Sequence, residues 1–331
     1  MPSQPVSAET AGPFPRASEA QSEYEPGYSW PPHLYRDNLR IAKPRRASQI
    51  KALESSQGMA TLPQLYARYL RLLGVTLAPP GLDGLRNLVR RHLLLVPFEN
   101  VSKLLLLARE GAGRPTTLSE FLDGIEDLDL GGTCYTSNPF LADLLRHLGY
   151  EADLLGADMS LPNIHTCIRV RLGNVPYHVD VGYGGPFREP LRLDRLPHEF
   201  TEGSLRYVLE RNHAEDAYGM TVFSGPDRVH GYVVHPPPRP LDFFHPVVRE
   251  SFARGRTFMS CLRLVRIFDS HSVELRDRTL TVHRAGKTTQ TELNSLAELK
   301  AAVGGTLAMP RCPIETAVEI LEQLTGRRFF G

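Results

Sequence analysis

Cys134 stands in the stretch DLGGTCYTSNPF, residues 129–140, two residues after a Gly-Gly pair and just before a run with helical spacing. Orphan N–H groups and the helix dipole at a helix N-terminus favour an anion, and so favour the thiolate form of a cysteine. Gly131 and Gly132 would let the backbone turn sharply and approach a substrate closely. A lone cysteine is more often a small buried apolar residue, so Cys134 is a candidate nucleophile only if the chain also supplies a base.

A base and a group to orient it are present in LPNIHTCIRVRLGNVPYHVDVGYGG, residues 161–185. This segment has the pattern of a β-hairpin that turns at Gly173-Asn174, a favoured two-residue loop. In that register Cys167 faces Asp180, and His165 becomes a diagonal neighbour of Asp180 on the same face, with Cα atoms about 7–8 Å apart. An imidazole can reach a carboxylate over that distance. The pattern therefore predicts a nucleophile, a base and an orienting group in the order Cys134, His165, Asp180.

The hairpin also offers weaker alternatives. Cys167 lies within a strand, where no helix N-terminus would activate it, and His178 sits farther along the hairpin, close to Arg169. In an inert arrangement His165 would cap a strand and Asp180 would pair with Arg169. The face with His165 and Asp180 is mostly polar, and the opposite face is predicted to be the core side, with Ile168, Val170, Leu172, Tyr177, Val179 and Val181.

Helices and strands must hold these residues in place. Helical periodicity predicts helices over 61–75, 82–96 and about 138–148, and again over 294–304 and 313–326. Short β-rich pieces separated by turn residues fill 152 to about 285. Residues 1–58 are rich in Pro, Ser, Glu and Ala and are predicted to be a disordered tail. The sequence therefore predicts an α+β protein, helical first, then β, then a small α/β end.

Composition excludes several classes of protein. A formal net charge of +1 gives no reason to expect nucleic acid or a membrane surface as partner. The four cysteines lack CxxC pairs, and no HExxH motif is present, so neither a metal site nor a disulfide framework is expected. No apolar run approaches the roughly 20 residues that span a bilayer, and no secretory signal pattern is evident. We therefore expect a cytoplasmic protein.

VPFEN (96–100), GGTCYTSN (131–138), His165 and DVGYGG (180–185) together resemble the arylamine N-acetyltransferase family, and the likeness extends over roughly residues 59–325. The resemblance implies an N-terminal helical bundle with the cysteine over 59–150. It further implies a β-barrel-like domain with the histidine and aspartate over 151–250, and an α/β lid over 251–331. The core would be a Cys-His-Asp arrangement like that of cysteine proteases.

The resemblance also implies a reaction. Cys134 would take an acetyl group from acetyl-CoA as a thioester and pass it to an arylamine, arylhydrazine or related small amine, with acetyl-CoA as co-substrate and no permanently bound cofactor. His165 would move the proton, and Asp180 would hold its tautomer. Phe98 and Tyr183 would line the acceptor pocket, and Gly184 would border the CoA path. The expected partners are an acyl-CoA and a small amine.

Two positions depart from the family pattern. Leu130 stands where the family usually has an arginine, which could pair with Glu99, and Tyr183 stands where phenylalanine is typical. These changes leave open an amide synthase that acts on a carrier-bound acyl chain. A non-catalytic paralogue that binds a ligand is a second alternative, although such a protein would not need the Cys, His and Asp together. A thiol protease fits the triad but not the likeness along the chain. The sequence leaves the acceptor and the oligomeric state open.

Overall fold

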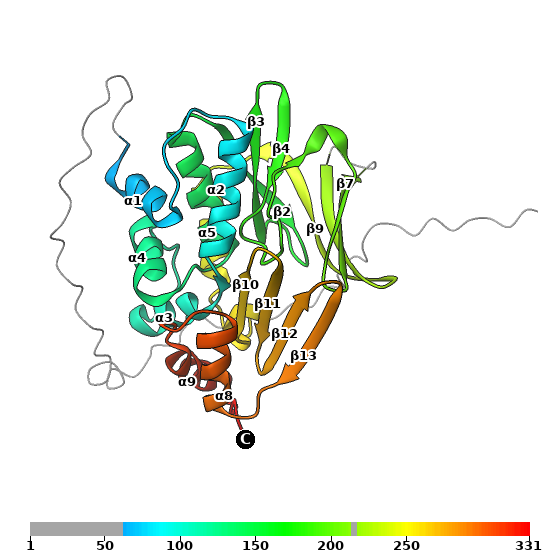
Figure 1. Ribbon diagram of the computed structural model, residues 1–331. Helices are drawn as coiled ribbons and strands as arrows, with labels where there is room; N and C mark the ends of the chain where they lie inside the picture. Colours follow the sequence, from blue (N-terminus) through cyan, green and yellow to red (C-terminus); the bar gives the residue numbers. More distant parts are fainter. Residues whose placement is uncertain (1–61, 213–216) are drawn as a thin grey trace, which may run out of the picture. The chain divides into compact units, whose positions relative to one another are not determined.

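The computed structural model describes residues 62–212 and 217–331. The tail predicted over 1–58 lies outside these residues. The chain begins with helices, which lie together before the first long strands (Figure 1). They are α1 (Gln64–Leu73), α2 (Leu82–Leu95), α3 (Val101–Glu110), α4 (Leu118–Leu128) and α5 (Cys134–His147). The helices predicted over 61–75 and 82–96 are confirmed. α3 and α4 were not predicted, although α4 begins with a capping box between Thr117 and Glu120.

The observed burial of α1 agrees with the predicted apolar stripe except at Leu65. It ends at Gly74, which adopts the left-handed conformation expected of a residue just past a helix. Tyr69, Leu70 and Leu73 are buried, as one apolar stripe requires. Leu65, which the pattern placed on the same stripe, is 39% exposed and lies at the edge of that stripe.

α5 begins at Cys134 itself, one turn earlier than the predicted start at 138. The prediction rested on the helical spacing of the apolar residues from Phe140 to Leu148, which begins after the first turn of the helix. In the structure Pro139 lies inside the helix, where its missing N–H removes the backbone bond to the carbonyl of Tyr135. The helix tolerates that loss, and Cys134 thereby becomes its first residue.

Within the described residues, eight antiparallel strands form one sheet in the order β5-β4-β3-β2-β9-β8-β7-β6, which curls into a nearly closed barrel (Figure 1). The strands are β2 (Glu151–Asp158), β3 (His165–Leu172), β4 (Val175–Val179), β5 (Leu191–Arg192), β6 (His198–Glu202), β7 (Leu205–Asn212), β8 (Ala217–Ser224) and β9 (Asp227–Pro238). A short 3-10 turn, Leu193–Arg195, follows β5.

The β3–β4 hairpin has the predicted register, because Leu172 pairs with Val175 and Ile168 pairs with Val179. The face predicted to be the core side is confirmed as buried. The apolar face packs into the same core as Leu141 and Leu144 of α5. The face with the polar residues is buried as well, because β8 and β9 curl across it.

The C-terminal part forms a second antiparallel sheet, ordered β1-β10-β11-β12-β13 within the described residues. Its first strand, β1, is only Phe98–Glu99, from the segment between α2 and α3. The other strands are β10 (Arg263–Ile267), β11 (His271–Arg276), β12 (Thr279–Arg284) and β13 (Lys287–Glu292). The helical elements of this part are Leu241–Phe244, α6 (His245–Glu250), α7 (Thr257–Ser260), α8 (Leu296–Ala301), the π-helix Ala302–Thr306 and α9 (Ile314–Thr325).

The C-terminal part shares a core with α3, because α9 packs on α3 and the apolar residues of both lie in one cluster. The predicted boundary at 150 falls between α5 and β2, and the one at 250 falls at the end of α6. Both remain predictions. The α+β fold, with helices first, a barrel next and a sheet with helices last, is confirmed.

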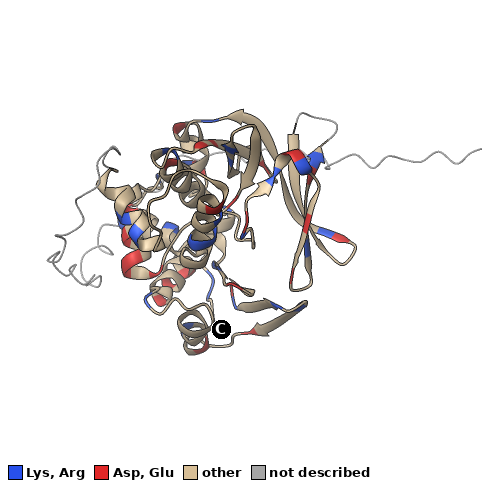
Figure 2. Cartoon of the chain, turned by 45° about the horizontal axis from the view of Figure 1, so that its top comes forward, with Lys and Arg blue, Asp and Glu red and all other residues tan. Residues whose placement is uncertain are grey.

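Acidic and basic residues are interspersed over the helices and strands of the described part (Figure 2), in keeping with the small net charge. No helix among the described residues is long and apolar enough to cross a membrane. The four cysteines all lie in that part, and each is a buried free thiol.

Candidate active site

Cys134 lies at the N-terminus of α5 and is 5% exposed. As the first residue of a helix, its backbone N–H has no carbonyl one turn earlier to bond. Two glycines allow this placement. Gly132 has a φ of +90°, which L residues rarely adopt. At Gly182 a Cβ atom would lie 2.6 Å from the Cα of Cys134, so only glycine lets the two backbones approach this closely.

His165, at the start of β3, donates a hydrogen bond from Nε2 to Oδ2 of Asp180 over 2.7 Å. Burial alone would lower the pKa of His165, but the charge and hydrogen bond of Asp180, together with Cys134, raise it to about 10. Burial alone would raise the pKa of Asp180, but His165 lowers it to about 2. The two side chains therefore form a buried imidazolium–carboxylate pair at neutral pH.

Cys134 lies beside His165. The Sγ of Cys134 lies 3.8 Å from the backbone carbonyl oxygen of Ile164, the residue before His165, and Cys134 acts with Asp180 to raise the pKa of His165. Because Nε2 is bonded to Asp180, Nδ1 is the ring nitrogen that Asp180 does not occupy. The Cys134 carbonyl accepts a hydrogen bond of 2.9 Å from the hydroxyl of Thr166, which ties the start of α5 to β3. The structure thus brings together all three residues predicted to form the triad.

Asn138, one turn into α5, was not singled out from the sequence although it closes the GGTCYTSN motif. Its amide Nδ2 donates to Oδ1 of Asp180 over 3.0 Å and also to the carbonyl of Thr166. Its Oδ1 accepts from the backbone N–H of Val181 over 2.9 Å. One side chain thereby joins the helix that begins at Cys134 to both strands of the hairpin, and fixes the carboxylate of Asp180.

The remaining predicted site residues lie beside the triad. The ring of Tyr183 packs edge-on against that of His165, with centroids 5.6 Å apart. The Phe98 ring fills the space beside Gly184, because a Cβ added at that glycine would lie 3.3 Å from the ring. The hydroxyl of Tyr183 also hydrogen-bonds Nδ1 of His230, a histidine that the sequence analysis did not single out.

Among the described residues no arginine pairs with Glu99, and its carboxylate accepts three backbone N–H groups. Oε1 accepts from Gly131 and Gly132, and Oε2 accepts from Ser102 over 2.8 Å. Burial raises the pKa of Glu99, while these hydrogen bonds act in the opposite direction. Leu130 is buried in the C-terminal core cluster. With Leu130 in place of the expected arginine, both carboxylate oxygens of Glu99 still accept hydrogen bonds.

Lys103 is a buried cation that the sequence analysis missed. Its side chain is 8% exposed, donates to the hydroxyl of Ser251, and lies 3.8 Å from the centroid of the Phe252 ring. Burial lowers the pKa of Lys103 to about 7, and the charge of Cys134 acts in the opposite direction. No ion pair joins Lys103 to an acidic residue of the described part.

The alternatives raised by the hairpin do not fit the structure. Cys167 is fully buried, and burial raises the pKa of its thiol well above the ordinary value. Arg169 pairs with Asp153 across the neighbouring strand at 2.6 Å, and not with Asp180. His178 is bonded to two tyrosines inside the barrel.

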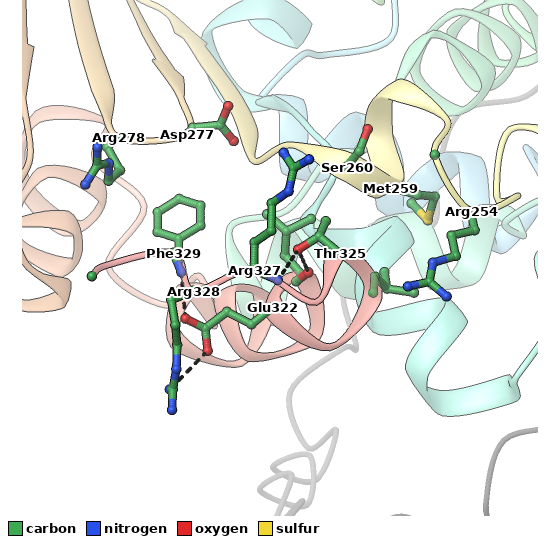
Figure 3. Close-up of a pocket in the computed structure, with 14 residues that line it drawn as sticks. Arg254, Met259, Ser260, Asp277, Arg278, Glu322, Thr325, Arg327, Arg328 and Phe329 are labelled. Carbon is green, nitrogen blue, oxygen red and sulfur yellow. Dashed lines mark hydrogen bonds and ion pairs between the residues drawn. The ribbon is translucent and has the colours of Figure 1, made fainter.

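A cavity of about 530 Å³ lies at the C-terminal end of the chain, and none of its lining residues is a predicted site residue. It is lined by four arginines, but they do not converge. Arg254 and Arg278 lie at opposite ends of the cavity (Figure 3), and Arg328 faces Glu322 at 3.8 Å. No cluster of His, Cys, Asp or Glu among the described residues could hold a metal ion.

Comparison with known proteins gives consistent matches. Residues 81–307 match a family described as N-acetyltransferase. An arylamine N-acetyltransferase of Mycolicibacterium smegmatis is 28% identical over 248 residues, which cover 71% of this chain and 88% of that protein. The solved arylamine N-acetyltransferase from Mycobacterium abscessus has a TM-score of 0.68 at 21% identity, covering 80% of this chain and 95% of that one. The enzyme of Mycobacterium marinum in complex with CoA has a TM-score of 0.63 at 23% identity, covering 78% and 97%.

Proposed function

The chain belongs to the arylamine N-acetyltransferase family, and from that premise we propose that Cys134 carries an acetyl group from acetyl-CoA to an arylamine. The observation that carries this proposal is the position of Cys134 at the start of α5, bonded to the residues on either side of His165, whose imidazole is itself bonded to a buried carboxylate. A solved relative binds CoA, which supports CoA as the leaving group of the first step.

In the first half-reaction, the Cys134 thiolate attacks the carbonyl carbon of the acetyl-CoA thioester. A C–S bond to Cys134 forms, and the bond to the CoA sulfur breaks. His165, protonated at neutral pH, gives its Nδ1 proton to the departing thiolate. The orphan backbone N–H of Cys134 is placed to stabilise the oxyanion that forms on the carbonyl.

In the second half-reaction, the nitrogen of the arylamine attacks the acetyl-Cys134 carbonyl. His165, now neutral, accepts a proton from that nitrogen, and the Cys134 thiolate leaves. The enzyme returns to its starting ion pair, so the cycle conserves protons. Asp180 holds Nε2 of His165 in a hydrogen bond, so Nδ1 is the nitrogen that exchanges protons with the reacting groups.

The aromatic residues beside the triad fit the acceptor. Tyr183 packs against His165, and together with Phe98 it would contact the ring of an arylamine. Gly184 would border the path of CoA. A carrier-bound acyl chain in place of acetyl-CoA, and a cytoplasmic location, remain predictions from the sequence.

Single-turnover mass spectrometry tests the proposal. Wild-type protein is mixed with acetyl-CoA alone, and an arylamine is then added. We expect one acetyl group on the intact protein, lost on addition of the amine with formation of the N-acetylated product. Cys312→Ala is the matched control, because Cys312 is another buried thiol but lies in the C-terminal core. An adduct that forms equally on Cys134→Ala would overturn the assignment.

A further inference from the structure

We propose that His178 is a positioning residue for the reaction, and that it fixes the carboxylate of Asp180 through the hydroxyl of Tyr232. The inference rests on the proposed function, because it assigns a role to a group behind the Cys134–His165–Asp180 arrangement. His178 is on β4, two residues before Asp180, and is 1% exposed.

Two tyrosines from different strands bond the two nitrogens of the His178 ring. The hydroxyl of Tyr232, on β9, lies 3.0 Å from Nε2. The hydroxyl of Tyr218, on β8, lies 3.2 Å from Nδ1. Both tyrosines are buried, as is His178. Their mutual hydrogen bonds therefore satisfy polar groups that water does not reach.

The direction of each hydrogen bond follows from Asp180. Its ionised carboxylate can only accept, and the Tyr232 hydroxyl lies 2.8 Å from Oδ2, so Tyr232 donates there. The oxygen of Tyr232 must then accept from His178, which places the proton of the neutral ring on Nε2. Nδ1 is left as an acceptor, and the Tyr218 hydroxyl donates to it. Tyr218 thereby selects the tautomer of His178 that Tyr232 requires.

The ring stays neutral in this position. Burial lowers the pKa of His178 to about 4, while Asp180 acts to raise it and His165 and His198 act to lower it. A neutral imidazole with one donor and one acceptor is therefore the form that joins the two phenols. The bonds run in one direction, from Tyr218 through His178 and Tyr232 to Asp180, so each polarises the next.

The far end of this chain is the atom that holds the reacting imidazole. Oδ2 of Asp180 accepts from both Tyr232 and Nε2 of His165, while Oδ1 accepts from Asn138 and from the N–H of Gly182. Four donors therefore fix the plane of the carboxylate. Without His178 the Tyr232 hydroxyl loses the donor that orients it, and the carboxylate is less firmly aimed at His165.

The test compares His178→Leu with His178→Gln. Leucine fills the space but makes no hydrogen bond, whereas the glutamine amide can donate to Tyr232 and accept from Tyr218. Tyr207→Phe is the matched control, because Tyr207 is another buried tyrosine of the barrel, and no hydrogen bond links it to Asp180. The first readout is the rate of Cys134 acetylation at saturating acetyl-CoA, with the KM measured in parallel.

The second readout needs no acetyl-CoA. It is the downfield proton resonance of the His165–Asp180 hydrogen bond, assigned by its loss in His165→Gln. We expect His178→Leu to shift or broaden this resonance and to slow acetylation about tenfold with little change in KM, whereas His178→Gln stays close to wild type. Because the resonance does not depend on acyl transfer, it separates failure of this inference from failure of the proposed function.

An unchanged resonance in His178→Leu would overturn the inference, as would equal losses in His178→Leu and Tyr207→Phe. Should His178→Leu fail to fold, Tyr218→Phe replaces it. That variant keeps the ring and removes the donor to Nδ1, so the same shift of the resonance is expected, and an unshifted resonance there counts against the proposal.

Discussion

Glu99 accepts a hydrogen bond from the backbone N–H of Gly132, two residues before Cys134. Through its other oxygen the same carboxylate accepts from Ser102 in the first turn of α3. It therefore joins the start of α3 to the loop that delivers Cys134, a role that an ion pair with an arginine would otherwise share. Because backbone N–H groups hold the carboxylate of Glu99, this link does not depend on which side chain stands at position 130.

Glu99→Gln tests the anchor. The amide oxygen of glutamine can still accept from the two glycine N–H groups. The amide NH₂ then lies beside the N–H of Ser102, and two donors cannot hydrogen-bond each other. We expect the free energy of unfolding to fall by about 1–3 kcal/mol, measured by urea denaturation. Glu319→Gln, on the exposed side of α9, is the control and should change stability little. Equal stability of the two variants would contradict the role of Glu99.

Asp180→Asn tests the orienting carboxylate. The partner whose charge raises the pKa of His165 is lost, so burial is expected to bring that pKa below its ordinary value and leave the ring neutral at pH 7. We expect acetyl transfer to slow by at least about 100-fold. Thermal unfolding should also show lower stability, because Asn138, Tyr232 and Gly182 lose their charged acceptor. A variant with nearly normal rates would remove Asp180 from the mechanism.

Lys103→Met should stabilise the protein at low pH. The pKa of Lys103 falls from 10.5 in the unfolded chain to about 7 in the fold. Between these values the unfolded state binds the extra proton, so the stability of the wild type rises as the pH rises from 7 toward 10.5. Below pH 7 the fold carries the full cost of the buried charge.

Methionine fills the same space without a charge. We therefore expect Lys103→Met to be more stable than wild type by about 1–4 kcal/mol near pH 6, with the gain shrinking toward pH 10. Denaturant unfolding at a series of pH values measures the difference. A gain that is constant across this range would show that Lys103 does not titrate as described.

Tyr183→Phe restores the side chain typical of the family and removes the hydroxyl bonded to His230. Because Tyr183 is proposed to contact the acceptor, we expect the KM for an arylamine to change about two- to tenfold, and the KM for acetyl-CoA to change less. Steady-state kinetics with each substrate varied in turn measures this. A change confined to acetyl-CoA would place Tyr183 on the donor side.

Local pattern was enough to predict the base and its partner, because the Gly173-Asn174 turn fixes the register of the β3–β4 hairpin and thereby the spacing of His165 and Asp180. The Gly-Gly pair and the helical run that follows it pointed to Cys134, although α5 begins one turn earlier than predicted. Periodicity alone predicted the order of the three parts, and the likeness to a known family implied the same order.

What the sequence could not show depends on contacts between distant segments. Tyr218 and Tyr232 help to bury the polar face of the hairpin, and they lie 40 and 54 residues after His178, to which they bond. β1 has only two residues, too few for a period-2 pattern to register. Lys103 lies in an apolar run, VSKLLLLA, whose burial depends on the C-terminal segment that covers it.

The most direct test of the whole account is the site of acetylation in the first half-reaction. Wild-type protein is incubated briefly with acetyl-CoA and no acceptor, digested at low pH to preserve a thioester, and the peptide that contains Cys134 is examined by mass spectrometry beside that of Cys312→Ala. The account predicts one hydroxylamine-sensitive acetyl group on Cys134 in both proteins. An acetyl group on any other residue, or none on Cys134 while arylamine is still acetylated, would contradict it.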